Sequence, residues 1–170
     1  MMHNELANNA SSMQTKLFHI LTHSRFFKNF NIYQEYPVNK LIQDYRYGSH
    51  RVDWYIKELG LVIELMGQQH YKPVNFSNEG KFLVLDKFSK IKERDHLKRE
   101  ALIAAGYTYI EIKYDEDLTE SLLLSKLEQS PIKEPLHVKD KPNTKPVSKS
   151  VPLSKQFSSF KRSINNRASK

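Results

Sequence analysis

Two carboxylic acids, Asp53 and Glu64, stand out because each lies in a short segment where apolar and polar residues alternate. This alternation predicts β-strands over residues 52–56 and 61–66, each with one face toward the core. A tight turn with Gly60 separates the two segments, so we expect an antiparallel hairpin. Carboxylate oxygens suit hard cations such as Mg²⁺, so the chemistry to consider first is that of a metal site.

Matching the apolar faces of the two strands fixes the register of the hairpin. The predicted pairs are Val52 with Leu65, Trp54 with Ile63, Ile56 with Leu61 and Asp53 with Glu64. Facing carboxylates repel each other, so we expect either that one keeps its proton or that both share a cation. Mg²⁺ or Mn²⁺ fits the second case, because such an ion takes one or two protein carboxylates together with substrate phosphate. The alternative is an ordinary hairpin that carries acids on its solvent-facing side.

Polar residues follow the second strand directly, in the run GQQHYK that starts at Gly67. Catalytic groups often lie where a strand ends. A histidine at such a place, His70, can accept a proton from water at physiological pH. Its neighbours Gln69 and Lys72 are candidates for contacting a phosphate group.

A long helix is predicted over residues 82–105, and Gly106 ends it. Its buried side is expected to consist largely of apolar residues, namely Phe82, Leu85, Phe88, Leu97 and Leu102. Residues three and four apart share a helix face, so Lys92, Asp95, Lys98 and Arg99 can project together. Aimed at the acids of the hairpin, this face offers one more carboxylate and cations for phosphate. The alternative is a solvated face without a special function.

The remaining elements complete an α/β fold. A helix is predicted over residues 11–28, and a strand over residues 31–38 carries Glu35, a further candidate for the acidic pocket. A strand over residues 107–114 and a closing helix that ends near residue 129 come after the long helix. Strand, helix and strand in succession predict a parallel crossover. We therefore expect a mixed four-stranded central sheet flanked by helices.

Charge and proline content divide the chain into an α/β domain over residues 1–130 and a tail over residues 131–170. The tail holds ten of the 27 Lys and Arg residues, two of the 19 acids and five of the seven prolines, so the net charge of +8 arises there. Such a segment buries too little apolar surface to offset its ordering entropy, so we expect it to be largely disordered, with a short helix over residues 154–165. Its charge would attract DNA, or it serves solubility alone.

Several classes of protein are disfavoured by what the sequence lacks. It has no cysteine, which excludes disulfides and thiolate metal sites. It has no apolar run of about 18 residues, so no membrane span is predicted. Its first residues show no basic segment followed by an apolar run, so no secretory signal is predicted, and we expect a cytoplasmic protein.

Three motifs occur in the order found in one group of nucleases: RVDWYI, VIELMGQQHYKP and ERDHLKR. Together they resemble the PD-(D/E)xK nuclease superfamily, and more narrowly a branch that includes very-short-patch repair endonucleases and related phage-type and homing endonucleases. The resemblance implies a restriction-endonuclease-like fold. It also implies an acid, acid, histidine, acid set, here Glu35, Asp53, His70 and Asp95, with Glu64 at the superfamily's second acid position.

One position departs from that pattern. The superfamily has a lysine two residues past its second acid, and this chain has Met66 there. The role of that lysine would then pass to Gln69, His70, Lys72 or Lys98, and the resemblance implies His70.

The function that we expect on this basis is Mg²⁺- or Mn²⁺-dependent endonucleolytic hydrolysis of DNA. We expect Asp53, Glu64 and the Leu65 carbonyl to bind the metal, and Glu35 and Asp95 to complete or orient its coordination shell. His70 is expected to assist proton transfer. Gln69 and Lys98 are expected to position the phosphate, with Lys72 and Arg99 as further phosphate contacts. DNA is the expected partner, and cutting both strands would call for a dimer. The alternatives are a catalytically inactive DNA-binding protein of the same fold, favoured by Met66, and a structure-specific resolvase or repair nuclease.

Overall fold

The helices and strands predicted for residues 1–130 all have counterparts in the computed structural model, which describes residues 6, 10–75 and 79–130. In chain order the elements are α1 (Ser12–His23), β1 (Ile32–Pro37), the 3₁₀ turn η1 (Val38–Lys40), β2 (Arg51–Ile56), η2 (Lys57–Leu59), β3 (Leu61–Met66), η3 (Gln68–His70), α2 (Lys81–Ala104), β4 (Thr108–Lys113) and α3 (Glu120–Gln129). The tail over residues 131–170, with its predicted short helix, lies outside the described residues.

Helix α1 starts after its N-cap residue, Ser11, but ends earlier than predicted. The cause is Ser24, whose side chain accepts hydrogen bonds from backbone N–H groups that would otherwise bond within the helix. Its hydroxyl accepts hydrogen bonds from the backbone N–H groups of Phe26 and Phe27, at 3.0 and 3.1 Å, and donates one of 2.6 Å to Glu120. A serine side chain that bonds nearby backbone groups in this way offers the chain an alternative to continuing the helix.

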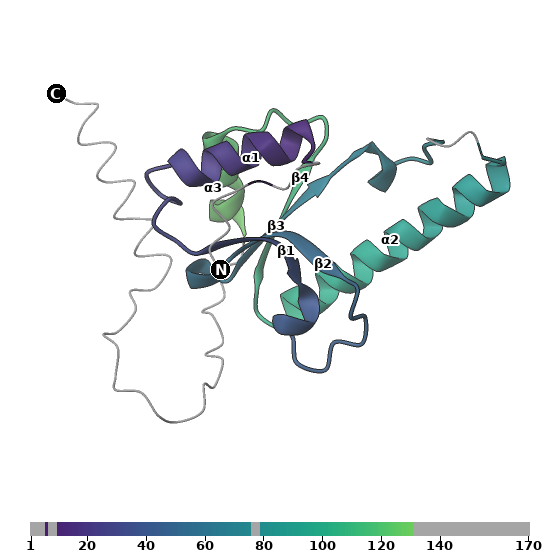
Figure 1. Cartoon of the computed structure of the whole chain (residues 1–170), viewed down its shortest axis with the longest axis horizontal. Coiled ribbons are helices and arrows are strands. Elements are labelled where there is room, and N and C mark those ends of the chain that lie inside the picture. The colour runs from purple at the N-terminus through teal and green to yellow at the C-terminus, as the bar shows by residue number, and fades with distance from the viewer. Residues whose placement is uncertain (1–5, 7–9, 76–78, 131–170) are drawn as a thin grey trace.

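The four strands form one mixed sheet in the order β1-β2-β3-β4 (Figure 1). The first three are antiparallel neighbours, and β4 returns parallel to β3 after the crossover helix α2, as predicted. The hairpin register is confirmed from Trp54 opposite Ile63 to Ile56 opposite Leu61. Gly60 adopts a left-handed conformation with φ 53° at the turn, where a side chain would be strained.

Both faces of the sheet are covered by helices. Figure 1 shows α1 and α3 together on one side of the sheet and α2 on the other. One core joins α1 and α3 to residues such as Trp54 and Ile63, and a second core contains Tyr55, Val62 and Leu102 of α2. The prediction of one core face per hairpin strand is therefore wrong, because the crossover helix buries the second face as it does in parallel sheets.

Only the C-terminal half of α2 packs on the sheet. Lys98 and Leu102 are buried there, whereas Phe82 near the start of the helix is 90% exposed. Figure 1 shows this first half projecting beyond the sheet. The predicted buried side is thus wrong for Phe82 and Leu85, because the sheet is shorter than the helix, and right for Leu102. None of the described helices is both long enough and apolar enough to cross a membrane.

Candidate active site

Four acids form a row across the sheet, one on each strand. Glu35 lies between paired residues of β1 at the position that faces Asp53 of β2. Asp53 of β2 and Glu64 of β3 each lie one residue beyond the last pair of the hairpin, Trp54 with Ile63, and Glu64 is the parallel partner of Glu111 on β4. The row faces α2, where Arg99 lies 3.9 Å from Glu111. The sheet therefore concentrates negative charge along one line beneath the helix.

The strands β2 and β3 separate at Asp53. Their paired register ends at Trp54, and the backbone N–H of Leu65 donates a 2.7 Å hydrogen bond to Oδ2 of Asp53 instead of to a backbone carbonyl of β2. The predicted pairings of Asp53 with Glu64 and of Val52 with Leu65 are wrong for this reason. Burial raises the pKa of Asp53, against the opposing effects of this N–H group and of Lys98.

Glu64 and Lys98 form a buried ion pair at the centre of the site. Their exposed fractions are 4% and 5%, and Nζ of Lys98 lies 2.9 Å from Oε1 of Glu64. The same ammonium group donates a 3.0 Å hydrogen bond to the carbonyl of Arg51, and Oε1 of Glu64 accepts no well-directed hydrogen bond. Burial, with a further contribution from Asp53, raises the pKa of Glu64 to about 8 in spite of the neighbouring ammonium.

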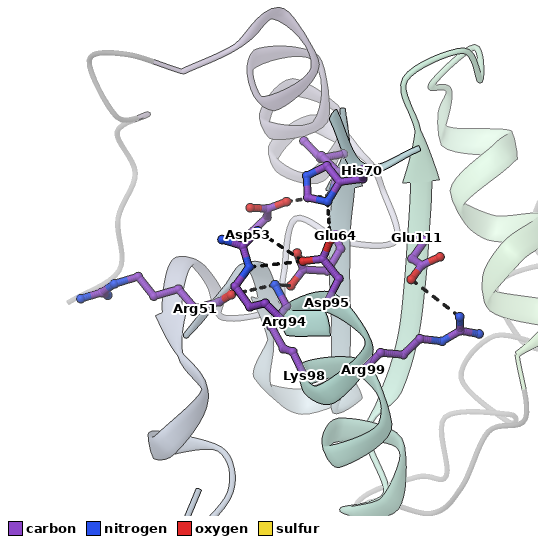
Figure 2. A network of polar contacts seen from close by, with 10 residues as sticks. Arg51, Asp53, Glu64, His70, Arg94, Asp95, Lys98, Arg99 and Glu111 are labelled. Carbon is purple, nitrogen blue, oxygen red and sulfur yellow. Dashed lines mark hydrogen bonds and ion pairs between the residues drawn. The ribbon is translucent and has the colours of Figure 1, made fainter. Parts of the chain in front are cut away.

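His70 and Asp95 form a second pair beside the first. His70 belongs to η3, directly after β3, and its Nδ1 is hydrogen-bonded to Oδ2 of Asp95 on α2. Burial opposes ionisation of Asp95, but the hydrogen bond and charge of His70, with Arg94 and Lys98, outweigh it and lower the pKa of that carboxyl. Because Asp95 engages Nδ1, the ring nitrogen left for a proton or a ligand is Nε2. Figure 2 shows the side chains of both pairs pointing toward one another from β3, η3 and α2.

Glu35 has an unusual backbone conformation for a strand residue. Its φ is 49°, and its carbonyl accepts a 2.8 Å hydrogen bond from Nη1 of Arg51. A left-handed residue other than glycine costs on the order of 1–3 kcal/mol, and such residues cluster at functional sites. Burial and the nearby Asp53 raise the pKa of Glu35, while Arg51 and Lys98 oppose this.

A pocket of about 600 Å³ opens over three of the four acids in the row, Glu35, Asp53 and Glu64. Its walls include most of the residues singled out from the sequence: Glu35, Asp53, Glu64, Leu65, Gln69, His70 and Lys98. Asp95 and Arg99 line a smaller neighbouring pocket of about 170 Å³, which also borders His70. Lys72 is exposed and lines neither pocket.

The pocket also contains residues that sequence reasoning missed. Arg51 is the first residue of β2, and Arg94 comes from the charged stretch of α2. The N-terminus of α1, from Ser11 to Gln14, closes another side. The sequence offered a signal for Arg51, which lies two residues before Asp53. It offered none for α1, because the position of that helix depends on packing between elements far apart in the sequence.

The side chain of Gln69 folds back over Gly67. A Cβ atom added at Gly67 would lie 2.5 Å from Oε1 of Gln69, which is closer than real Cβ atoms approach. Glycine at this position therefore allows the amide of Gln69 to sit against the chain at the edge of the pocket.

The donor atoms of the row suit a hard divalent cation. Asp53, Glu64 and the Leu65 carbonyl offer oxygen ligands on adjacent strands, and Oε1 of Glu64 is buried beside the Lys98 ammonium group without a well-directed hydrogen bond. Mg²⁺ commonly takes only one or two protein carboxylates, with waters and phosphate in its other positions. Within the described residues, no three histidine or acidic side chains are arranged to hold a metal on their own. The two carboxyl groups and the carbonyl would thus supply only part of the coordination shell of such an ion.

A scan against protein-family models and a search of curated proteins each find no match to this chain.

Proposed function

We propose that this protein is a Mg²⁺- or Mn²⁺-dependent DNA endonuclease. The observation that carries the proposal is the convergence of Asp53 and Glu64 with Lys98 and with the His70 and Asp95 pair around one pocket. Acids that can hold a metal, a cation and an oriented imidazole are groups that support metal-assisted hydrolysis of phosphodiesters. The resemblance of the same residues to the PD-(D/E)xK motifs supports this assignment, and a restriction-endonuclease-like fold is part of the proposal.

Asp53 and Glu64, with the Leu65 carbonyl, would hold the ion. A bound Mg²⁺ supplies Lewis-acid chemistry, since it makes water a better nucleophile and offsets negative charge on the phosphate. In this proposal Nε2 of His70 accepts the proton of the attacking water, and Asp95 keeps the ring oriented through Nδ1. Glu35 completes the acidic wall of the pocket.

Lys98 would take the role of the superfamily's lysine. Met66, which occupies that position in the motif, lines the neighbouring pocket, whereas Lys98 brings an ammonium group to Glu64 from α2. From there its charge stabilises the phosphate in the transition state. Gln69 and Arg94 at the edge of the same pocket would position the phosphate.

The test is cleavage of plasmid DNA with Mg²⁺, with Mn²⁺ and with EDTA by three variants. Asp53→Ala and Glu64→Ala should each abolish the metal-dependent cleavage. Glu111→Gln is the matched control, because Glu111 lies in the same row of acids but outside the larger pocket, and it should cleave normally. Full cleavage by either alanine variant would refute the assignment.

A catalytically inactive DNA-binding protein is the second candidate. Two observations favour it: Met66 replaces the superfamily's lysine, and Glu64 is already paired with Lys98. The same experiment separates the two, because this candidate binds the plasmid and leaves it intact at every metal concentration. Cutting of both strands by the active enzyme would further imply a dimer on double-stranded DNA.

A further inference from the structure

Three aromatic side chains cluster beside the larger pocket, and one of them, His50, lines it. The rings of Tyr47 and His50 are parallel within 8°, with centroids 4.9 Å apart. Tyr45 meets Tyr47 edge-on at 5.7 Å, and its hydroxyl lies 2.8 Å from Nδ1 of His50. We call Tyr45, Tyr47 and His50 the aromatic stack. Its rings hold one another in place through geometry that aromatic pairs prefer.

The backbone fixes the aromatic stack in front of β2. The N–H of His50 donates a 3.0 Å hydrogen bond to the carbonyl of Tyr47, and the His50 carbonyl accepts one of 3.0 Å from Val38. Asp44 turns the chain with φ 65°. A segment held in this way loses little conformational freedom when it binds a ligand, so a contact made by its rings is preorganised.

The aromatic stack runs from the pocket to solvent. His50 lines the pocket beside Arg51, and Tyr47 on its far side is 46% exposed. Burial, with the nearby charges of Arg94 and Lys98, lowers the pKa of His50, although Asp95 opposes this. At neutral pH the aromatic stack is therefore uncharged, and the ring of Tyr47 at its outer end is exposed to solvent.

An intact duplex hides the faces of its bases and presents phosphates and groove edges. A base outside a helix exposes its π-face and stacks readily on an aromatic side chain. We propose that the aromatic stack binds an unpaired nucleobase next to the scissile phosphate, so that the substrate class is DNA with unpaired bases, such as bulged, mismatched or branched DNA. This inference rests on the proposed nuclease function and narrows its substrate.

The experiment measures binding without cleavage, using the full-length Asp53→Ala protein in EDTA. Two fluorescent DNA probes share one sequence, one fully paired and one with a central bulge containing 2-aminopurine, whose fluorescence is quenched when it stacks. The bulged probe should bind more tightly and lose fluorescence. Adding Tyr47→Ala or Tyr47→Leu should weaken binding of the bulged probe about tenfold and leave the paired probe nearly unchanged. Tyr47→Phe, which keeps the ring, should bind as Tyr47 does.

Tyr114→Ala is the matched control, because Tyr114 has a similar exposed fraction of 42% and lies beyond β4, outside the pocket. Equal losses for the two probes on Tyr47→Ala, or the same selective loss on Tyr114→Ala, would overturn the inference. Selective loss at Tyr47 would support it even if the unmodified protein cuts no DNA, in which case only the proposed nuclease function fails. Metal-dependent cleavage of the bulged probe that is unchanged by Tyr47→Ala, together with unchanged binding of that probe, would leave the nuclease function in place and overturn the inference alone.

Discussion

The ammonium group of Lys98 lies 2.9 Å from Oε1 of Glu64, in a place where both side chains are almost completely buried. Ions removed from water in this way lose several kcal/mol of solvation each, and their attraction offsets this only in part. The raised pKa of Glu64 reflects the same balance. In this site, burial makes Glu64 keep its proton to unusually high pH, whereas the ammonium group of Lys98 favours loss of that proton.

Replacing Lys98 with Met should destabilise the protein more at pH 9 than at pH 6. Without the ammonium group, the ionised form of Glu64 is a buried charge without compensation, and losing one partner of such a pair costs about 3–5 kcal/mol. At the lower pH Glu64 is protonated and the cost is smaller. Urea unfolding at the two pH values measures the difference. In the Glu64→Gln variant, replacing Lys98 with Met should lower the free energy of unfolding by the same amount at pH 6 and at pH 9. A loss that still depends on pH in that variant would contradict this account.

Glu64 should also make the free energy of unfolding fall as pH rises. Its pKa is about 8 in the folded protein against an ordinary value of 4.5, so between these values the folded state holds a proton that the unfolded chain has lost. The stabilising contribution is complete below pH 4.5 and disappears as pH rises through about 8. Thermal or urea unfolding of the Glu64→Gln variant should show a flatter pH dependence across this window. Glu111→Gln, the control, should retain the slope of the unmodified protein.

Glu35 offers a test of strain at the site. Glu35→Gly should raise the free energy of unfolding by about 1 kcal/mol, because glycine adopts φ 49° without steric cost. The same variant should cleave DNA more slowly, since it lacks the carboxylate. Glu35→Gln removes the charge but keeps the backbone strain, so it should share the loss of activity without the gain in stability. Equal stability of the two variants, measured by urea unfolding, would show that the conformation is not strained.

His70 and Asp95 should affect the rate of cleavage more than substrate binding. His70→Ala should lower kcat by about 10²–10⁴-fold, the usual contribution of general acid or base catalysis. Asp95→Asn should lower kcat by about 10–100-fold, as expected when the group that orients a histidine is replaced. Steady-state kinetics on an oligonucleotide measures both, with KM as the check on binding. The control is His96→Ala, at an exposed histidine next to Asp95 in the chain, which should leave kcat unchanged.

The hairpin could be predicted from sequence because its information is local. Alternation over residues 52–56 and 61–66, with Gly60 between them, leaves one register that buries both apolar faces. That register is observed from Trp54 opposite Ile63 to Ile56 opposite Leu61, and Asp53 and Glu64 lie one residue beyond it, where the strands separate. The predicted face of α2 also holds, since Asp95 and Lys98 both point to the site.

The features that could not be predicted depend on contacts between distant elements. The alignment of Glu111 with Glu64 requires the register of a parallel pair, which no turn constrains. The burial of Glu64 follows from where α2 lies, and the burial of Phe82 was predicted wrongly for the same reason. The left-handed conformation of Glu35 has no signature in a segment that otherwise alternates like an ordinary strand.

The hydrogen bond from the Leu65 N–H to Asp53 gives the site a built-in spectroscopic probe. An amide proton held by a carboxylate moves in chemical shift when that carboxylate gains a proton or a cation. The resonance of one backbone amide would therefore follow what happens at the acid in real time, without any label placed in the pocket itself.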